Sequence, residues 1–182
     1  MKIGIDAHNL EGQRTGVGRY LFNLLKNWND FDLSADKANL PSDLKFILYF
    51  KKEIPKELSF LSDKFQFRRL ASKLESNVFF THYLLPRAAK RDAIDILFCP
   101  AYVAPIFYRR KIALTLHDII YQVHPELYNW PSIWDRILLK RFSRIAARKA
   151  EIIFVPSEYS KKEVLKYYEI KPEKVFNTPL AA

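Results

Sequence analysis

Glycine, cysteine and long apolar runs are scarce in this sequence, and the scarcity of each limits which structures the chain can form. All four glycines lie in the first 18 of 182 residues, so the chain concentrates its conformational freedom in one N-terminal turn. The single cysteine, Cys99, excludes an intrachain disulfide framework and predicts a reducing compartment, the cytoplasm. The apolar runs have the length of strands, whereas a membrane-spanning helix needs roughly 20 apolar residues. The start at Met1-Lys2 shows no signal-peptide pattern.

The histidines and the net charge bear on metal sites and on binding partners. The four histidines have no spacing typical of metal ligands, so no metal is predicted. A net charge of +10 is compatible with nucleic acid, anionic lipid, phosphorylated substrates or solubility alone. The basic residues are not interleaved with aromatic ones, and no helix-turn-helix pattern accompanies them, so nucleic acid is not expected as a partner.

Strand and helix patterns alternate along the chain, in which 49% of residues are hydrophobic. The alternation predicts an α/β, Rossmann-like, doubly wound and mainly parallel sheet with helices on both faces, as a single domain over 1–182. A polar loop is expected over 29–42. Strands are expected at 2–6, 44–50, 65–70, 94–99, 111–116, 151–156 and, shortest, within 174–180. Helices are expected at 16–28, 77–91, 131–150 and 158–168, with a short one within 54–61. Ser76 and Ser157 are expected as the N-caps of the second and the fourth of these helices.

The glycine turn lies between the first strand and the first helix. The sequence Thr15-Gly16-Val17-Gly18 opens that helix, whose free N–H groups and dipole favour a phosphate, a carboxylate or a sugar. The glycine spacing matches neither the dinucleotide fingerprint nor the Walker A pattern. The alternative, that glycine serves only the packing of strand against helix, stays open.

Polar residues follow several expected strands. Ligands of open parallel sheets bind beyond the carboxyl ends of the strands, where Asp6, Tyr102, His117-Asp118 and Ser157 are expected. His117 can exchange a hydrogen bond with a sugar hydroxyl or a proton with Asp118, because its pKa lies near neutrality. The other three histidines are assigned structural roles, since none has an evident partner in the sequence.

The helix expected at 131–150 carries a basic stripe. Its members, Arg136, Lys140, Arg144 and Arg148, recur every four residues and therefore share one face. The stripe is either a solvated face or a contact for acidic lipid or phosphate groups. The core-facing side of the helix is expected to comprise Ile133, Ile137, Leu138, Phe142, Ile145 and Ala146.

Four motifs occur in order along the chain. They are Gly4-Ile-Asp-Ala7 with Thr15-Gly-Val-Gly-Arg-Tyr20, then Thr115-Leu-His-Asp118, then Val155-Pro-Ser-Glu-Tyr-Ser160, and Pro172-Glu-Lys-Val-Phe-Asn-Thr-Pro179. In this combination the whole chain resembles the N-terminal half of family 4 glycosyltransferases of the GT-B fold. The resemblance is greatest to bacterial mannosyltransferase-like members that build polysaccharides and lipopolysaccharides.

The resemblance implies the acceptor-side domain of an enzyme that moves a hexose, such as mannose, from a nucleotide sugar to a polysaccharide or lipid-linked acceptor. It also implies retention of configuration, with no metal and no other cofactor. In the family a C-terminal domain binds the donor through two glutamates separated by seven residues, and this sequence has no such pair. The chain is therefore expected to be a fragment that is inactive, or nearly so, by itself.

The resemblance also suggests site residues. Gly16, Val17 and Gly18 would offer backbone groups to the donor diphosphate or the acceptor, and His117 would contact the donor sugar, oriented by Asp118. Position and chemistry add three further candidates, Arg14, Arg19 and Ser157. His8 stands where relatives commonly have arginine, so whether this position takes part in acceptor binding is left open. Such domains often meet lipid-linked acceptors at the inner membrane surface, which would give the basic stripe a purpose.

Two other classes of function remain. One is a non-catalytic Rossmann-like module that binds a nucleotide or phosphorylated ligand for regulation. The other is nucleic-acid binding through charge, which steep salt dependence would reveal.

Overall fold

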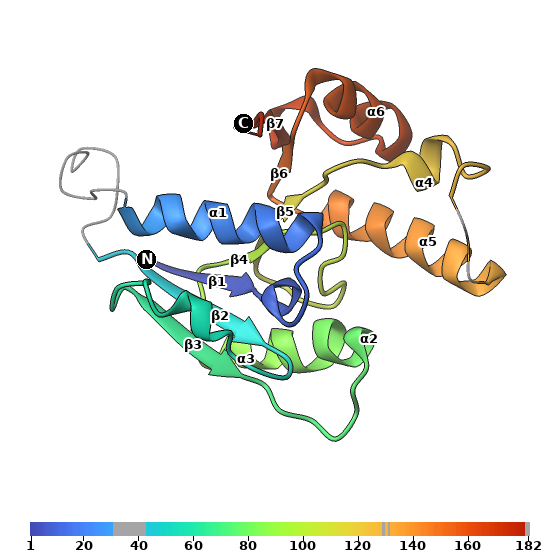
Figure 1. Cartoon of the computed structure of the whole chain (residues 1–182). Coiled ribbons are helices and arrows are strands. Elements are labelled where there is room, and N and C mark those ends of the chain that lie inside the picture. Colours follow the sequence, from blue (N-terminus) through green and yellow to red (C-terminus); the bar gives the residue numbers. More distant parts are fainter. Residues whose placement is uncertain (31–42, 129, 131, 181–182) are drawn as a thin grey trace. The chain divides into compact units, whose positions relative to one another are not determined.

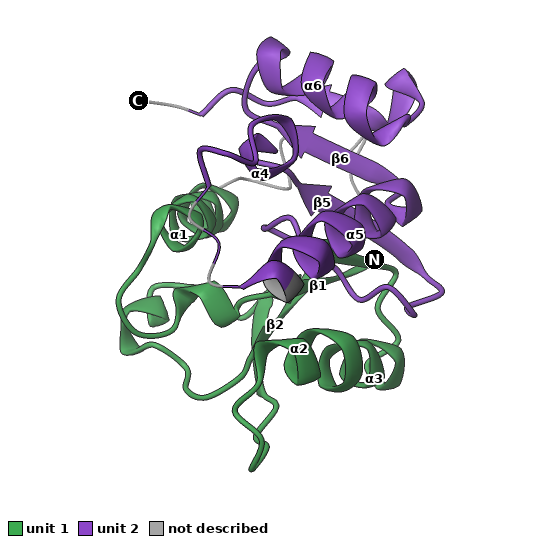
Figure 2. Ribbon diagram, turned by 90° about the vertical axis from the view of Figure 1, so that its right-hand side faces the viewer, with its two compact units in different colours: residues 1–98 green, residues 99–182 purple. Residues whose placement is uncertain are grey.

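The computed structural model describes residues 1–30, 43–128, 130 and 132–180, so most of the loop expected at 29–42 lies outside the described residues. The chain forms two compact units, Met1–Phe98 and Cys99–Ala182 (Figure 2). All strand pairs within each unit are parallel and are joined by helices, which confirms the predicted α/β, Rossmann-like fold. The prediction of one domain over 1–182 stays a prediction.

Unit 1 contains a parallel sheet in the order β3-β2-β1-β4. The central strand β1 pairs with β2 on one side and with β4 on the other. Every residue of β2 after Lys45 is buried, as expected of a strand covered on both faces. The strands are β1 (Lys2–Asp6), β2 (Lys45–Phe50), β3 (Phe65–Arg69) and β4 (Ile96–Cys99), whose last residue belongs to unit 2.

Helices cover both faces of this sheet. Helix α1 lies on one face, and the helical segments α2 to α3 lie on the other (Figure 1). Leu21 and Leu25 of α1 are fully buried, and the Trp28 ring stacks on Phe46 of β2 at 5.4 Å. The helical elements of unit 1 are η1 (His8–Leu10), α1 (Gly16–Asp30), η2 (Lys56–Leu58), α2 (Asn77–Phe79), η3 (Phe80–Leu84) and α3 (Leu85–Arg91).

The helix expected at 77–91 is not one continuous α-helix. Its predicted cap is confirmed, because the Ser76 hydroxyl accepts the N–H of Phe79 at 3.2 Å. A π-helical turn, η3, then separates α2 from α3. Pro86 explains the interruption, since it has no N–H for the carbonyl of His82 and its ring would clash with that carbonyl in a regular α-helix.

Unit 2 contains the parallel strands β5 (Lys111–Thr115), β6 (Ile152–Val155) and β7 (Val175–Asn177). Helix α6 (Glu158–Tyr168) begins at the predicted cap, where the Ser157 hydroxyl accepts the N–H of Ser160 at 3.1 Å. The other helical elements are α4 (Ile120–Val123), α5 (Ile133–Lys149) and η4 (Pro172–Lys174).

The predicted core face of α5 is wrong in its first half. Ile133, Ile137 and Leu138 are 60%, 46% and 44% exposed. Small side chains towards the C-terminal end are buried instead, and the Ser143 hydroxyl lies 3.1 Å from the Tyr168 hydroxyl of α6. This end of α5 packs closely, because residues with small side chains let it approach β5 and α6. The fully buried residues are Ser143, Ala146, Ala147 and, just after the helix, Ala150.

Candidate functional site

A cavity of about 390 Å³ lies in unit 1, beside the segments that follow β1 and β2. These are carboxyl ends of neighbouring parallel strands, the position at which open α/β sheets bind ligands. Asn77, the first residue of α2, completes the wall. The lining residues are His8, Asn9, Glu11, Gly12, Gln13, Thr15, Lys51, Lys52, Glu53 and Asn77.

His8 and Asp6 form a close pair at this cavity. Nδ1 of His8 lies 2.6 Å from Oδ1 of Asp6, whose carboxylate is almost completely buried. Burial disfavours the imidazolium, but the charge and hydrogen bond of Asp6, with help from Glu11, outweigh it and raise the pKa of His8 above its ordinary value. The Phe80 ring packs on the imidazole at 5.4 Å between centroids. His8 therefore has a partner that was not evident in the sequence, and its structural role stays a prediction.

Glu11 ties the segment after β1 to the segment after β2. Its carboxylate accepts the backbone N–H of Lys51 and, at 3.0 Å, that of Lys52. The Lys52 ammonium pairs with Glu75 at 2.6 Å, and the Lys51 ammonium donates to the Asn77 side chain. The lining thus contains two glutamates and two lysines, so its formal charges balance, together with amides, a hydroxyl and an imidazole. Such a lining suits a neutral ligand with many hydroxyl groups.

The glycines of the turn differ in their surroundings. A Cβ on Gly18 would lie 2.3 Å from the carbonyl oxygen of Asn9, so packing of α1 on η1 requires glycine there. A Cβ on Gly16 would meet no atom within 4 Å. The packing alternative therefore holds for Gly18 but does not account for Gly16, at the start of α1. Val17 is half-buried between them.

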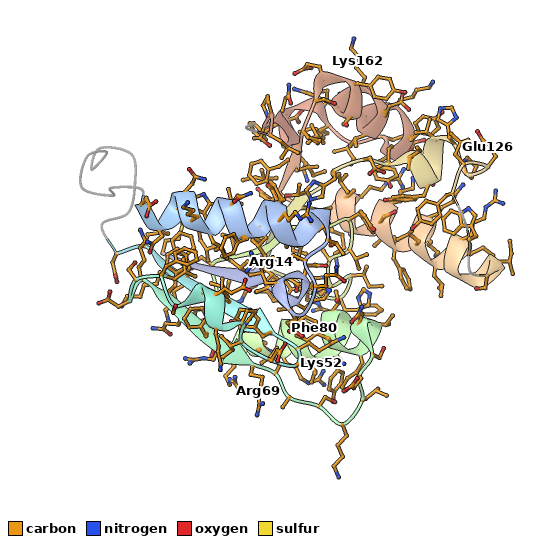
Figure 3. The ribbon with its side chains drawn as sticks, in the orientation of Figure 1. Arg14, Lys52, Arg69, Phe80, Glu126 and Lys162 are labelled. Atoms are coloured by element: carbon orange, nitrogen blue, oxygen red, sulfur yellow. The ribbon has the colours of Figure 1, made fainter. Side chains whose placement is uncertain are left out.

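The two arginines of the turn differ. The Arg14 guanidinium pairs with Glu57 and lies 3.8 Å above the centre of the Phe22 ring, so it holds α1 to neighbouring segments (Figure 3). Arg19 is exposed and has no ion pair among the described residues. Roles of either residue in ligand binding stay predictions.

In unit 2, His117 lies just beyond the carboxyl end of β5, after Leu116. Its Nε2 lies 3.0 Å from the carbonyl oxygen of Pro100. Burial lowers the pKa of His117, against smaller opposing effects of the Pro100 carbonyl and of Asp118, so the neutral imidazole is favoured near neutral pH. With that carbonyl accepting, Nε2 carries the proton. His117 is therefore held in place by backbone at the carboxyl end of a strand.

Asp118 and Ser157 have local structural partners. The Asp118 carboxylate accepts the N–H of Ile120 at 3.0 Å, which helps α4 to begin. Ser157 caps α6 and also donates its hydroxyl to the Ser160 hydroxyl at 3.1 Å. The orienting role of Asp118 and the binding role of Ser157 stay predictions. His117 and Ser157 follow neighbouring parallel strands, as expected from the sequence.

The basic stripe divides into two halves. Arg144 pairs with Glu169 at 3.2 Å, and Arg148 pairs with the same carboxylate and donates to the Tyr168 carbonyl at 3.0 Å. These two arginines hold α5 to the end of α6. Arg136 and Lys140 lie in the half that exposes Ile137 and its apolar neighbours, and neither forms an ion pair within the described part of the chain.

Among the described residues, no helix is both long and apolar enough to cross a lipid bilayer. No group of three or more histidine, cysteine, aspartate or glutamate side chains among them is arranged to hold a metal ion.

Comparison with known proteins identifies the class of protein. The family model described as "Glycosyltransferase Family 4" matches residues 48–178, more than half of the chain. The chain therefore belongs to glycosyltransferase family 4. No curated protein matches it.

A solved structure also matches, that of Anabaena Alr3699/HepE in complex with UDP and glucose. The TM-score is 0.58 at 15% sequence identity, and the match covers 98% of this chain and 44% of that chain. At this identity the likeness supports the fold. The chain spans less than half the length of that relative.

Proposed function

We propose that the chain is the acceptor-side domain of a hexosyltransferase. The enzyme would transfer a hexose, with mannose the first to be tested, from a nucleotide sugar to a polysaccharide or lipid-linked acceptor. The observation that carries the proposal is the polar cavity after β1 and β2, with two glutamates and two lysines in its lining, in a member of this family. The acceptor saccharide would bind there.

The proposed reaction proceeds with retention of configuration and without a metal. The donor would be shared with a C-terminal domain beyond this chain, so that these residues alone are inactive. The free N–H groups at Gly16 to Gly18 would stabilise negative charge on the departing nucleotide, and His117 would donate or accept a hydrogen bond at the donor sugar. Asp118, Arg14, Arg19 and Ser157 remain candidate supporting residues.

Chemical-shift mapping of the chain tests the acceptor cavity. Methyl α-D-mannopyranoside and methyl α-D-glucopyranoside are added separately to isotope-labelled protein. We expect shifts centred on the cavity, with binding weakened by Asn77→Ala and unchanged by Asn27→Ala, an exposed position on α1. Shifts elsewhere, or none with either glycoside, would contradict the proposal.

Gly16 favours one alternative, a non-catalytic module that binds a nucleotide or phosphorylated ligand. Its open surroundings at the start of α1 would admit a phosphate. UDP and GDP are the probes. Tight binding of either by this chain, with no transferase activity in the longest natural form of the protein, would favour the alternative over the acceptor-side domain.

We also propose that the protein is cytoplasmic and lies peripherally on the anionic inner surface of a membrane. The support is the net charge of +10 and the first half of α5, where Arg136 and Lys140 accompany exposed isoleucine and leucine side chains. Basic and apolar groups on one helix are typical of interfacial helices.

A further inference from the structure

The hydrogen bonds around Asp6 fix which nitrogen of His8 can change its protonation. One carboxylate oxygen of Asp6 accepts both the backbone N–H and the Nδ1–H of His8, at 3.4 and 2.6 Å. Because an ionised carboxylate only accepts, Nδ1 carries a proton in the neutral and in the charged imidazole alike. The Phe80 ring restricts the plane of the imidazole. Nε2 is therefore the titrating atom, and it has no hydrogen bond among the described residues.

The charges that face His8 favour the imidazolium. Asp6 on β1 is in direct contact, Glu11 after η1 adds a second negative charge, and Lys51 after β2 opposes them. The further charged residues of the cavity wall are Lys52, which is paired with Glu75, and Glu53. The pKa of His8 is raised in consequence, so the imidazolium persists closer to neutral pH than in an ordinary histidine.

We propose that the imidazolium of His8, held by Asp6, donates its Nε2–H to an oxygen atom of the acceptor saccharide in this cavity, so that saccharide binding tightens as the pH falls. This inference rests on the proposed function of the cavity as the acceptor site. With its proton on Nδ1, the neutral ring can only accept a hydroxyl proton at Nε2. A hydrogen bond from a charged donor is roughly twice as strong as one between neutral groups, which gives the direction of the effect. His8 is thereby a binding residue whose contribution depends on pH.

Linkage adds a second observable. A ligand that binds the protonated form more tightly must raise the pKa of His8 further when it binds. The pKa of His8 in the free and the liganded chain is therefore a readout that a merely structural histidine would not give. A histidine that only packs the floor of the cavity would keep its pKa or have it lowered by burial under the ligand.

The test measures the affinity of methyl α-D-mannopyranoside and methyl α-D-glucopyranoside by NMR from about pH 5 to about pH 8. We expect affinity to fall about tenfold over this range and the His8 pKa to rise on binding. His8→Gln should bind weakly with a flat pH profile, and His124→Gln, at an exposed position outside the cavity, should retain the parent profile.

Three results would overturn the inference. They are affinity that is independent of pH, affinity that rises with pH, and a pH dependence that persists in His8→Gln. If His8→Gln does not fold, the His8 pKa of the parent with and without glycoside decides the matter. Binding in the cavity with a flat profile removes this inference alone, whereas no binding at any pH removes the proposed acceptor site as well.

Discussion

Gly18 of α1 and Asn9 of η1 are in such close contact that a single methyl group could not fit between them. A Cβ on Gly18 would lie 2.3 Å from the Asn9 carbonyl oxygen, and the contacting atom is backbone. The same turn contains Gly16, whose surroundings are open. Packing therefore requires glycine at position 18 but does not explain it at position 16.

Alanine at these two positions should have opposite effects. Gly18→Ala should lower the free energy of unfolding by about 1–3 kcal/mol through overpacking. Gly16→Ala should leave it unchanged or raise it by up to about 1 kcal/mol, because alanine restricts the unfolded chain, but should weaken binding of UDP or GDP. Urea denaturation and nucleotide titration of both variants measure this. Equal destabilisation by the two substitutions would contradict the assignment.

The pKa values of His8 and His117 shift in opposite directions, which should give stability an optimum between acid and alkaline pH. His8 has a raised pKa in the folded protein, so its stabilising effect is complete below the unfolded value of about 6.5 and is lost as the pH rises through the folded pKa. His117 has a lowered pKa, so stability is lost as the pH falls from about 6.5 towards the folded value.

Thermal unfolding measured from acid to alkaline pH tests both expected effects, the loss of stability caused by His8 as the pH rises and that caused by His117 as it falls. His8→Gln should flatten the loss of stability on the alkaline side, and His117→Gln should flatten it on the acid side. His124→Gln is the control, because its exposed side chain is outside both sites. A His8→Gln variant that flattens the acid side instead would show that the environment of the imidazole is misassigned.

Patterns of residues close together in the sequence predicted much of this fold, but they could not predict contacts between segments that are far apart in the sequence. Ser76 and Ser157 were identified as caps because a cap depends on residues three positions away. The Asp6–His8 pair was missed although it is equally local; a carboxylate two residues before a histidine at a strand end was the available signal. The bonds from Lys51 and Lys52 to Glu11 could not be predicted, since they require β1 and β2 to be neighbours.

Apolar periodicity also has a physical limit that α5 demonstrates. The pattern shows which side of a helix is apolar, but not which part of its length has a packing partner. The first half exposes Ile137 and Leu138, and Ser143 is buried because its hydroxyl meets that of Tyr168. In the helix expected at 77–91, one proline was enough to introduce a π-helical turn.

His117→Ala tests the proposed donor-sugar contact. In the longest natural form of the enzyme, the variant should lose about 100-fold or more in turnover, as is typical when a positioned polar group at the reacting centre is removed. Its free energy of unfolding should change little by comparison, because a hydrogen bond such as that of the ring with the Pro100 carbonyl contributes only about 1 kcal/mol to stability. The control is His82→Ala, at a half-buried histidine in unit 1. Equal turnover of His117→Ala and the parent would exclude the contact.

Vesicle sedimentation tests the membrane proposal, and the division of the basic stripe makes the test specific. The chain should sediment with vesicles containing anionic phosphatidylglycerol more than with neutral phosphatidylcholine, and raised salt should reduce the difference.

Arg136→Glu with Lys140→Glu should lower binding to anionic vesicles by about tenfold or more, since each basic residue near the surface contributes about 1 kcal/mol and each reversal also adds repulsion. Arg144→Gln should have a smaller effect, because that guanidinium is already paired with Glu169. Ile137→Ser should weaken binding to both kinds of vesicle, because its exposed side chain would enter the interface. If anionic vesicles are not preferred, or if the double reversal binds like the parent, the first half of α5 is a solvated face and the net charge needs no membrane to explain it.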